Sequence, residues 1–436
     1  MYLVNDSTVL LIFTLLINIE KVSISICSNE ILEKFSYWNH SSILTSFHFG
    51  NLLSMIFGNQ ILKYVQNKEF CSSLFILAWS LLNILLTFTR DLNVINLINM
   101  VMGLFQGILI CSTMNSFQSQ IEKNKRVYFI FLIGAEMIGQ SLSFVMYSFF
   151  FWKNIFLTIG IIGIVVGIVN LKFRANILHT SVLFQENKLQ NSDGEMINLR
   201  LVKDFLFYLP LWAIFIAQSS TSWCLLNAIY WIPLYMKNYM HSTQLFISKL
   251  AFGPLFFIIV TIFRIFIYDY LSKYLSYHRI KQITTVISLI LSAGVIGIFI
   301  FLPSTMDTYL LICFMIGVCA LNLNGTYLEH QENLSAGTSL VTFLLSNSIC
   351  SISGIVNSFL NAFLITESHY RFVPILFLAA LINVVGAIVY FVESSILNSR
   401  TQSEHVQFLS PNKSSINDSP MNLTTSESPN EKFIFP

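Results

Sequence analysis

The sequence is poor in charge. Of its 436 residues, 11% are Asp, Glu, Lys or Arg, against about 25% in a typical soluble domain. The chain is also 55% hydrophobic, with a mean hydropathy of +0.68. Together these values exclude a soluble globular protein and predict an all-α polytopic membrane protein, each of whose helices needs roughly 20 apolar residues to cross the lipid bilayer. The net charge of +2 gives no evidence about nucleic acid, and we expect no nucleic-acid partner.

The chain lacks the residue clusters on which disulfide, metal and catalytic sites depend. Its 7 cysteines lie in or beside apolar segments without a metal-binding spacing, so we expect buried free thiols, no metal and no cofactor. No Ser-His-Asp, His-cluster or Cys-His arrangement occurs at matching depths, which argues against an enzyme. The first residues, MYLVNDS, lack a basic region and a small-residue cleavage site. We therefore expect the first apolar stretch to remain as a helix.

What the sequence does contain is a series of long apolar runs bounded by polar residues. They predict twelve membrane-spanning helices, near residues 8–28, 42–62, 70–89, 93–113, 128–150, 154–171, 206–235, 250–270, 282–302, 308–328, 340–363 and 372–392. Lys and Arg are concentrated in the loops of one side, which predicts that both termini are cytoplasmic. Transporters built from two such six-helix halves bind substrate near the midplane of the membrane.

The spans and loops predict four regions along the chain. These are an N-terminal six-helix half over 1–171, a cytoplasmic central loop over 172–204, a C-terminal six-helix half over 205–392 and a polar, disordered cytoplasmic tail over 393–436.

The first span carries two adjacent charges, Glu20 and Lys21, past its middle. A charge at that depth costs about 2.5–3.5 kcal/mol on insertion scales, so such residues usually face a partner or a watery cavity. Two other readings remain open, namely that both residues snorkel to an interface or that they form a purely structural pair. Two more ionisable residues lie within predicted spans. His48 could take a proton or only pack, and Glu136 could act in transport, pair with Lys21 or snorkel.

Several segments of the N-terminal half resemble the anion:cation symporter branch of the major facilitator superfamily, which includes vesicular glutamate, sialin-like and sodium–phosphate carriers. IEKVSISI resembles its Asp-Arg pattern, with Glu20 in the acidic position and Lys21 in the basic one. The branch's frequent proton-coupling Glu is replaced by Gln106, which cannot titrate, and a branch Arg by Asn99. Glycines that match in spans two and four, with gating or packing roles, are Gly50, Gly58, Gly103 and Gly107.

The resemblance continues in the C-terminal half and is clearest in span seven, LWAIFIAQSSTSWCLLNAIYWIPLY. Trp223 and Pro233 occupy branch positions there, while Ser222 replaces an Asn and Leu226 replaces a cavity-lining Tyr. A proline near a helix end can interrupt the hydrogen-bond ladder and allow gating. Further matches are Pro254 in span eight and Asn347 and Gly354 in span eleven.

The resemblance implies a secondary active or facilitative transporter that moves a small organic or inorganic anion, a carboxylate or phosphate, by alternating access. Lys21 would attract the anion, Glu20 would be its charge partner, and Glu136 and His48 are further coupling candidates. Hydrogen bonds around the cavity would come from Gln106, Asn51, Ser222, Asn227 and Asn347. The partners would be the anionic solute, the lipid bilayer and, if transport is coupled, a cation. The alternative is a non-transporting major-facilitator-like receptor or scaffold.

Overall fold

The computed structural model describes residues 6–32, 34–64, 68–120, 125–181, 209–238, 240–301, 305–333, 336–368 and 371–409. Across these ranges the regular structure is entirely helical, with no β-strand. Met1–Ser394 form one compact unit and Ser395–Pro436 a second. The cavity and the helices described below belong to the first unit, apart from the end of α16 after Ser394.

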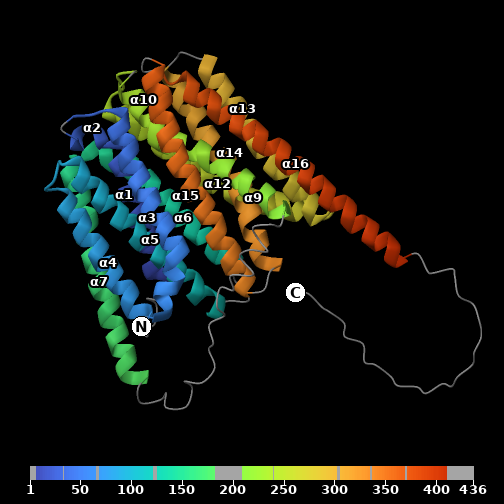
Figure 1. Cartoon of the computed structure of the whole chain (residues 1–436), viewed down its shortest axis with the longest axis horizontal. Helices are drawn as coiled ribbons and strands as arrows, with labels where there is room; N and C mark the ends of the chain where they lie inside the picture. Colours follow the sequence, from blue (N-terminus) through green and yellow to red (C-terminus); the bar gives the residue numbers. More distant parts are fainter. Residues whose placement is uncertain are drawn as a thin grey trace, which may run out of the picture. The chain divides into compact units, whose positions relative to one another are not determined.

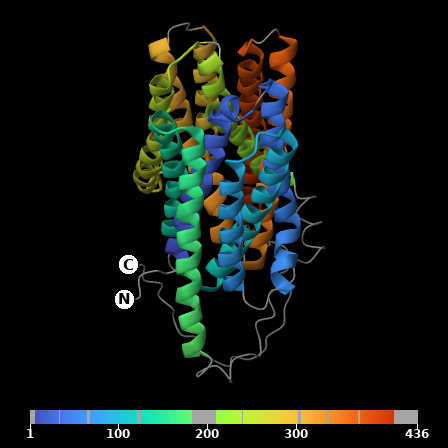
Figure 2. The same ribbon diagram turned by 90° about the vertical axis from the view of Figure 1, so that its left-hand side faces the viewer.

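Each of the twelve predicted spans has a helical counterpart (Figures 1 and 2). The N-terminal half contains α1 (Asp6–Ile26), α3 (Tyr37–Tyr64), α4 (Lys68–Leu86), α5 (Leu92–Gln120), α6 (Lys125–Phe149) and α7 (Trp152–Ser181). The C-terminal half contains α9 (Leu209–Leu226), α10 (Ile232–Asn238), α12 (Phe252–Leu271), α13 (Tyr277–Phe301), α14 (Thr305–Asn333), α15 (Ala336–Glu367) and α16 (Val373–Leu409). Short segments between them are α2 (Ser28–Ile31), the π-helix η1 (Asn227–Trp231), α11 (Gln244–Ser248) and the 3₁₀ turn η2 (Lys249–Ala251).

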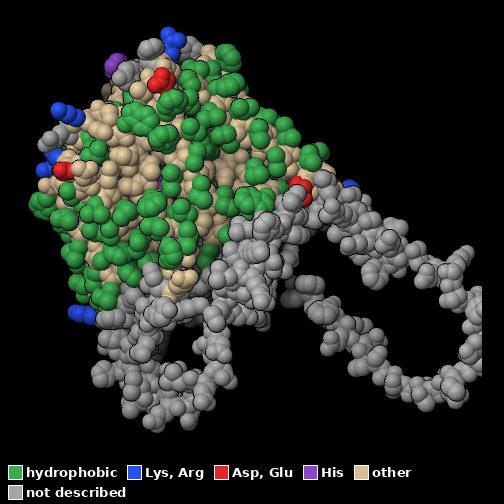
Figure 3. All heavy atoms as spheres, viewed as in Figure 1, with side chains coloured by type: hydrophobic (Ala, Val, Ile, Leu, Met, Phe, Trp, Pro, Cys, Tyr) green, Lys and Arg blue, Asp and Glu red, His purple; other side chains and the backbone are tan. Residues whose placement is uncertain are grey.

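Large apolar side chains face outward and many polar side chains are buried, as expected for a protein surrounded by lipid. In the described part of the chain, 6 helical segments are long and apolar enough to cross a membrane by themselves. Large apolar side chains point outward, among them Phe263 and Phe266, which are 61% and 67% exposed, and they cover much of the surface in Figure 3. Polar side chains such as Asn99, Asn322 and Asn361 are instead fully buried. This pattern confirms the predicted all-α polytopic membrane fold.

Two prolines with predicted gating or packing roles, Pro233 and Pro254, lie beside irregular helical turns. A proline ring in a helix clashes with the carbonyl group four residues earlier, which for Pro233 is that of Ile229. Ile229 lies in the π-helix η1, whose wider turn relieves that crowding. Pro254 lies in the first turn of α12, directly after the 3₁₀ turn η2. The missing N–H of Pro254 costs little there, because the first turn of a helix leaves its N–H groups unpaired.

Two helices extend beyond the predicted spans. The helix α7 continues to Ser181, into the predicted central loop, and α16 continues to Leu409, into the predicted tail. Neither extension contains the Gly or Pro that would end a helix. The rest of the predicted loop and tail lies outside the described residues.

Glycines allow α3 and α5 to pack backbone against backbone. A Cβ atom at Gly50 would collide with the carbonyl oxygen of Met100, and one at Gly103 with that of Phe47. A Cβ at Gly107 would likewise collide with the Ser54 hydroxyl group. Gly58 differs, since its Cβ would be in ordinary contact, 3.4 Å from the Cys111 sulfur. Three of the four predicted packing glycines thus stand where only a small residue fits, as is common between membrane helices.

Candidate functional site

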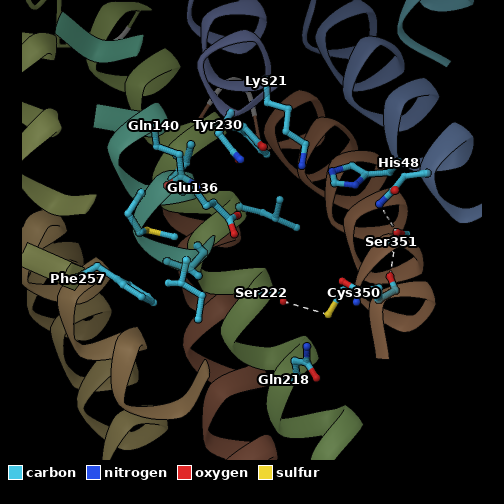
Figure 4. Close-up of a pocket in the computed structure, with 18 residues that line it drawn as sticks. Lys21, His48, Glu136, Gln140, Gln218, Ser222, Tyr230, Phe257, Cys350 and Ser351 are labelled. Atoms are coloured by element: carbon cyan, nitrogen blue, oxygen red, sulfur yellow. Dashed lines mark hydrogen bonds between the residues drawn. The ribbon is translucent and has the colours of Figure 1, made fainter. Parts of the chain in front are cut away.

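A cavity of about 260 Å³ is lined by helical segments from both predicted halves of the chain, three from each. They are α1, α3 and α6 of the N-terminal half, and α9 with η1, α12 and α15 of the C-terminal half (Figure 4). Lining residues on one helix recur at spacings of three or four positions, with some adjacent pairs such as Glu136 and Met137, which puts them on one face. The lining side chains with polar groups are Asn18, Lys21, His48, Asn51, Glu136, Gln140, Gln218, Ser222, Tyr230, Asn347, Cys350 and Ser351.

Lys21 enters this cavity from α1. Its ammonium nitrogen lies 4.9 Å from the centre of the Phe47 ring, within the range of a cation–π interaction. Among the described residues it forms no salt bridge and no hydrogen bond. The cation is therefore accessible from the cavity and available to an anion.

Glu136 faces the same cavity from α6 (Figure 4). Its charge and that of Lys21 are near enough to attract each other. Within the described ranges, however, no salt bridge of 4.0 Å or less joins Lys21 to Glu136. The cavity thus contains an acid and a base that are held apart.

Glu20 does not share the environment of its neighbour. Successive residues on a helix point about 100° apart, so Glu20 faces the protein interior while Lys21 faces the cavity. The Glu20 side chain is fully buried, and neither carboxylate oxygen has a hydrogen-bond partner in the described part of the protein. No salt bridge to Lys21 is formed there either. The role of Glu20 as charge partner of Lys21 stays a prediction, since the two charges still attract each other without a salt bridge.

Other predicted residues do line the cavity. Asn51 of α3 donates to the Ser351 hydroxyl group of α15 over 3.1 Å, which joins the two halves. Ser222 of α9 lies 3.3 Å from the Cys350 sulfur, and Asn347 lines the cavity one turn earlier on α15.

His48 lines the cavity as well, and its ring lies over Gly354 of α15. A Cβ atom at Gly354 would come within 2.7 Å of that ring. Gly354 therefore makes room for the His48 ring between α3 and α15.

Three residues that the sequence singled out do not line the cavity. Gln106 is buried in α5 and does not line the cavity. Asn227 accepts hydrogen bonds from the amide groups of Asn357 and Asn361, over 3.0 and 2.6 Å, and so belongs to a buried amide cluster. Trp223 is buried in the core that surrounds these helices.

Sequence reasoning missed part of the lining. Asn18 lies three residues before Lys21, Gln140 four after Glu136, Gln218 four before Ser222 and Ser351 four after Asn347. Each is one helical turn from a predicted residue, so extending each predicted face by one turn would have found them.

The two halves also meet at the end of the bundle that carries α2 and α10, here called the α2/α10 end (Figure 1). Lys237 of α10 donates to the Glu30 carboxylate of α2 and to the Tyr147 hydroxyl group of α6, each over 2.9 Å. Tyr147 in turn donates to Glu30 over 3.2 Å. Beside them, Asn29 donates to Asn238 over 2.7 Å. These contacts join the halves beyond the cavity.

The electrostatics of this contact favour a charged Lys237. Burial lowers the pKa of Lys237, but the hydrogen bonds to Tyr147 and Glu30 and the charge of Glu30 raise it by more. The pKa of Lys237 therefore lies above its ordinary value, and the ammonium group keeps its proton.

A search among curated proteins found no match to the chain. The family model described as Major Facilitator Superfamily matches residues 37–329, about two thirds of the chain. The match covers most of the helices described above and agrees with a cavity built by three helical segments of each half. The chain thus belongs to the Major Facilitator Superfamily, a family of membrane transporters, and is an integral multi-pass membrane protein.

Proposed function

We propose that this protein is a carrier that moves a small solute with an anionic group, a carboxylate or a phosphate, by alternating access. The observation that carries the proposal is Lys21. It is the one Lys or Arg among the described residues that line the cavity, and it has no anionic partner within salt-bridge distance. A cation placed in this way between two halves is suited to hold an anion near the midplane.

The size and chemistry of the site agree with a small solute. A cavity of about 260 Å³ lies just below the usual range of ligand sites, about 300–1,000 Å³. A hydrogen bond to a charged group contributes about 1.5–3 kcal/mol. Lys21 also stands in the basic position of the anion:cation symporter branch. Lysine lacks the planar fork of arginine but still acts as a point charge toward a carboxylate or phosphate.

We further propose that uptake depends weakly on a proton gradient. The branch's proton-coupling position is Gln106, which cannot titrate and does not line the cavity. Uptake would then be driven by the membrane potential or by exchange. Strong uphill uptake driven by a pH gradient, if it survived both Glu20→Gln and Glu136→Gln, would contradict this part of the proposal.

Cytoplasmic termini would place the α2/α10 end outside, since α1 leads from the N-terminus to α2. The contacts at the α2/α10 end would then join the two halves on the outer side of the membrane. The positive-inside pattern of the loops supports this orientation. Labelling of His241→Cys, in the chain segment after α10, by a membrane-impermeant thiol reagent tests it in sealed membranes whose cytoplasmic face is outward. Protection until detergent is added supports the orientation, and labelling without detergent would reverse it.

Counterflow in proteoliposomes tests the function itself. A panel of small carboxylates and phosphates, with and without an amine, should reveal exchange by the wild type, and Lys21→Gln should reduce its rate by about tenfold or more, the loss of one charged hydrogen bond. Lys249→Gln is the matched control. Lys249 also lies over aromatic rings, 5.1 Å from Phe246 and 5.5 Å from Tyr309, but does not line the cavity. Its loss should leave exchange unchanged, whereas no exchange with any solute would favour a receptor or scaffold.

A further inference from the structure

The cavity holds one cation and one anion on different helices. Lys21 projects from α1 and Glu136 from α6, and both side chains are partly exposed to the same space (Figure 4). Elsewhere in the described chain a comparable pair is closed, since Lys237 and Glu30 lie 2.9 Å apart. The gap in the cavity is therefore a property of this site and not of the chain as a whole.

Several neutral polar groups of the lining are engaged with each other or with other residues. The amide of Asn51 is bonded to Ser351, and Ser222 is in contact with Cys350. The amide oxygen of Gln218 accepts a hydrogen bond from Ser346. Lys21 and Glu136 are the one Lys and the one carboxylate among the described residues that line the cavity, whereas Glu20, next to Lys21 in the sequence, is fully buried outside it.

A solute with a negative group alone fits this arrangement poorly. Its charge would satisfy Lys21 but would also approach the carboxylate of Glu136, and like charges in a desolvated site repel strongly. Entry of the solute would displace water from Glu136 as well, and a charge that loses water without gaining a partner is costly. A solute with both charges avoids both penalties.

We infer that the ligand of this cavity is a small zwitterion, whose anionic group binds Lys21 and whose protonated amine binds Glu136. Its apolar part would lie against Ile133, Met137 and Leu225, which line the cavity beside the two charges. The inference rests on the proposed function, because it specifies the solute of the same cavity. It adds Glu136 as a residue that selects for the amine.

Three probes with one carbon skeleton test this inference. They are L-leucine, 4-methylpentanoate, which lacks the amine, and isopentylamine, which lacks the carboxylate. Binding is measured on the purified full chain by thermal shift and titration calorimetry. The wild type should bind leucine about tenfold or more tightly than either analogue, which is the effect of one charged hydrogen bond. β-Alanine and γ-aminobutyrate, with propionate and butyrate, extend the comparison to other charge separations.

Two variants locate the selectivity. Glu136→Gln should remove most of the preference for a zwitterion over its matched acid, and Lys21→Gln most of the preference over the matched amine. Glu367→Gln, which removes an exposed carboxylate at the end of α15, should change neither ratio.

Each other outcome has a defined meaning. Three results would overturn the inference. The wild type could bind the acids as tightly as their zwitterions, it could bind none of the probes, or Glu136→Gln could leave the ratio of zwitterion affinity to acid affinity unchanged. If any of these results is found, exchange of plain acids in counterflow would still support the carrier function. Binding of zwitterions without any counterflow would instead contradict the carrier function and leave the zwitterion site intact.

Discussion

The pairs Lys237–Glu30 and Lys21–Glu136 each bring together opposite charges from different helices, and they differ in geometry. Lys237 and Glu30, at the α2/α10 end, lie 2.9 Å apart and share the Tyr147 hydroxyl group. Lys21 and Glu136, in the cavity, attract each other without forming a salt bridge. The first pair connects the two halves and completes its own hydrogen bonds. In the second pair, neither charge has a salt-bridge partner among the described residues, and both face the cavity.

The difference indicates which pair serves stability and which serves binding. A closed and hydrogen-bonded pair is worth most to the fold, because no polar group is left without a partner. Charges that stay apart cost stability, and a protein retains such a cost chiefly where function needs it. The two pairs should therefore respond to mutation with opposite changes in stability.

Removal of both cavity charges should have the largest effect. In Lys21→Met with Glu136→Met, we expect the affinity for zwitterions to fall by about 100-fold or more, since two charged hydrogen bonds are lost. The Tm should rise, because apolar replacement of poorly satisfied charges often stabilises by about 1–4 kcal/mol. Binding and thermal denaturation of the purified double variant measure both. A lower Tm would show that the two charges form a structural pair.

Mutation of the buried amide cluster should lower the stability, as we also expect for mutation of the Lys237–Glu30 pair. Asn227→Ala leaves the Asn357 and Asn361 amides without their shared acceptor, at a cost of about 1–3 kcal/mol for an unsatisfied buried group. We expect a lower Tm with ligand affinity unchanged within about threefold. Titration of the folded variant provides the check. A loss of affinity at unchanged Tm would return Asn227 to the binding site that the sequence predicts.

Mutation of the Lys237–Glu30 pair should change the stability by less than mutation of the cavity pair, and in the opposite direction. Glu30→Gln and Lys237→Met should each lower the stability by about 1 kcal/mol, the usual contribution of a hydrogen bond. Both side chains are about one quarter exposed, so solvent screens part of their attraction. A double-mutant cycle on the Tm isolates the coupling between them. Strict additivity would mean that the pair contributes nothing.

Alkaline pH should remove the stabilisation by the Lys237–Glu30 pair without any mutation. The pKa of Lys237 is raised by its partners, so the stabilisation is complete below the unfolded-state pKa of about 10.4. It is lost as the pH rises through the higher folded-state pKa. The Tm difference between wild type and Lys237→Met should therefore be constant near neutral pH and shrink above pH of about 10.4. A difference that persists into strong alkali would point to packing of the lysine stem instead.

Much of the fold could be predicted from the sequence because apolar length determines membrane helices. All twelve spans have helical counterparts, and errors were confined to helix ends such as that of α7, where no Gly or Pro marks a stop. The π-helix η1 was not predictable from hydropathy. It results from the conflict between Pro233 and the turn before it, which only the backbone path reveals.

The site was predicted in part, for a similar reason. Lys21 and Glu136 were singled out because a charge at membrane depth needs an explanation. Whether they pair could not be known, because that depends on the separation of α1 and α6. The direction of Glu20 and the cluster around Asn227 also depend on how each helix is rotated about its axis. Spacing along one helix does not fix that rotation relative to its neighbours.

Exchange of the two cavity charges tests the central claim most directly. If Lys21 and Glu136 each bind one end of a zwitterion, each single reversal, Lys21→Glu or Glu136→Lys, should lower the affinity for leucine by about 100-fold or more. The double variant with both reversals should recover affinity to within about tenfold of the wild type, with the ligand turned end to end. Titration calorimetry on the four proteins gives the answer. A double variant that binds no better than the weaker single variant would contradict the account.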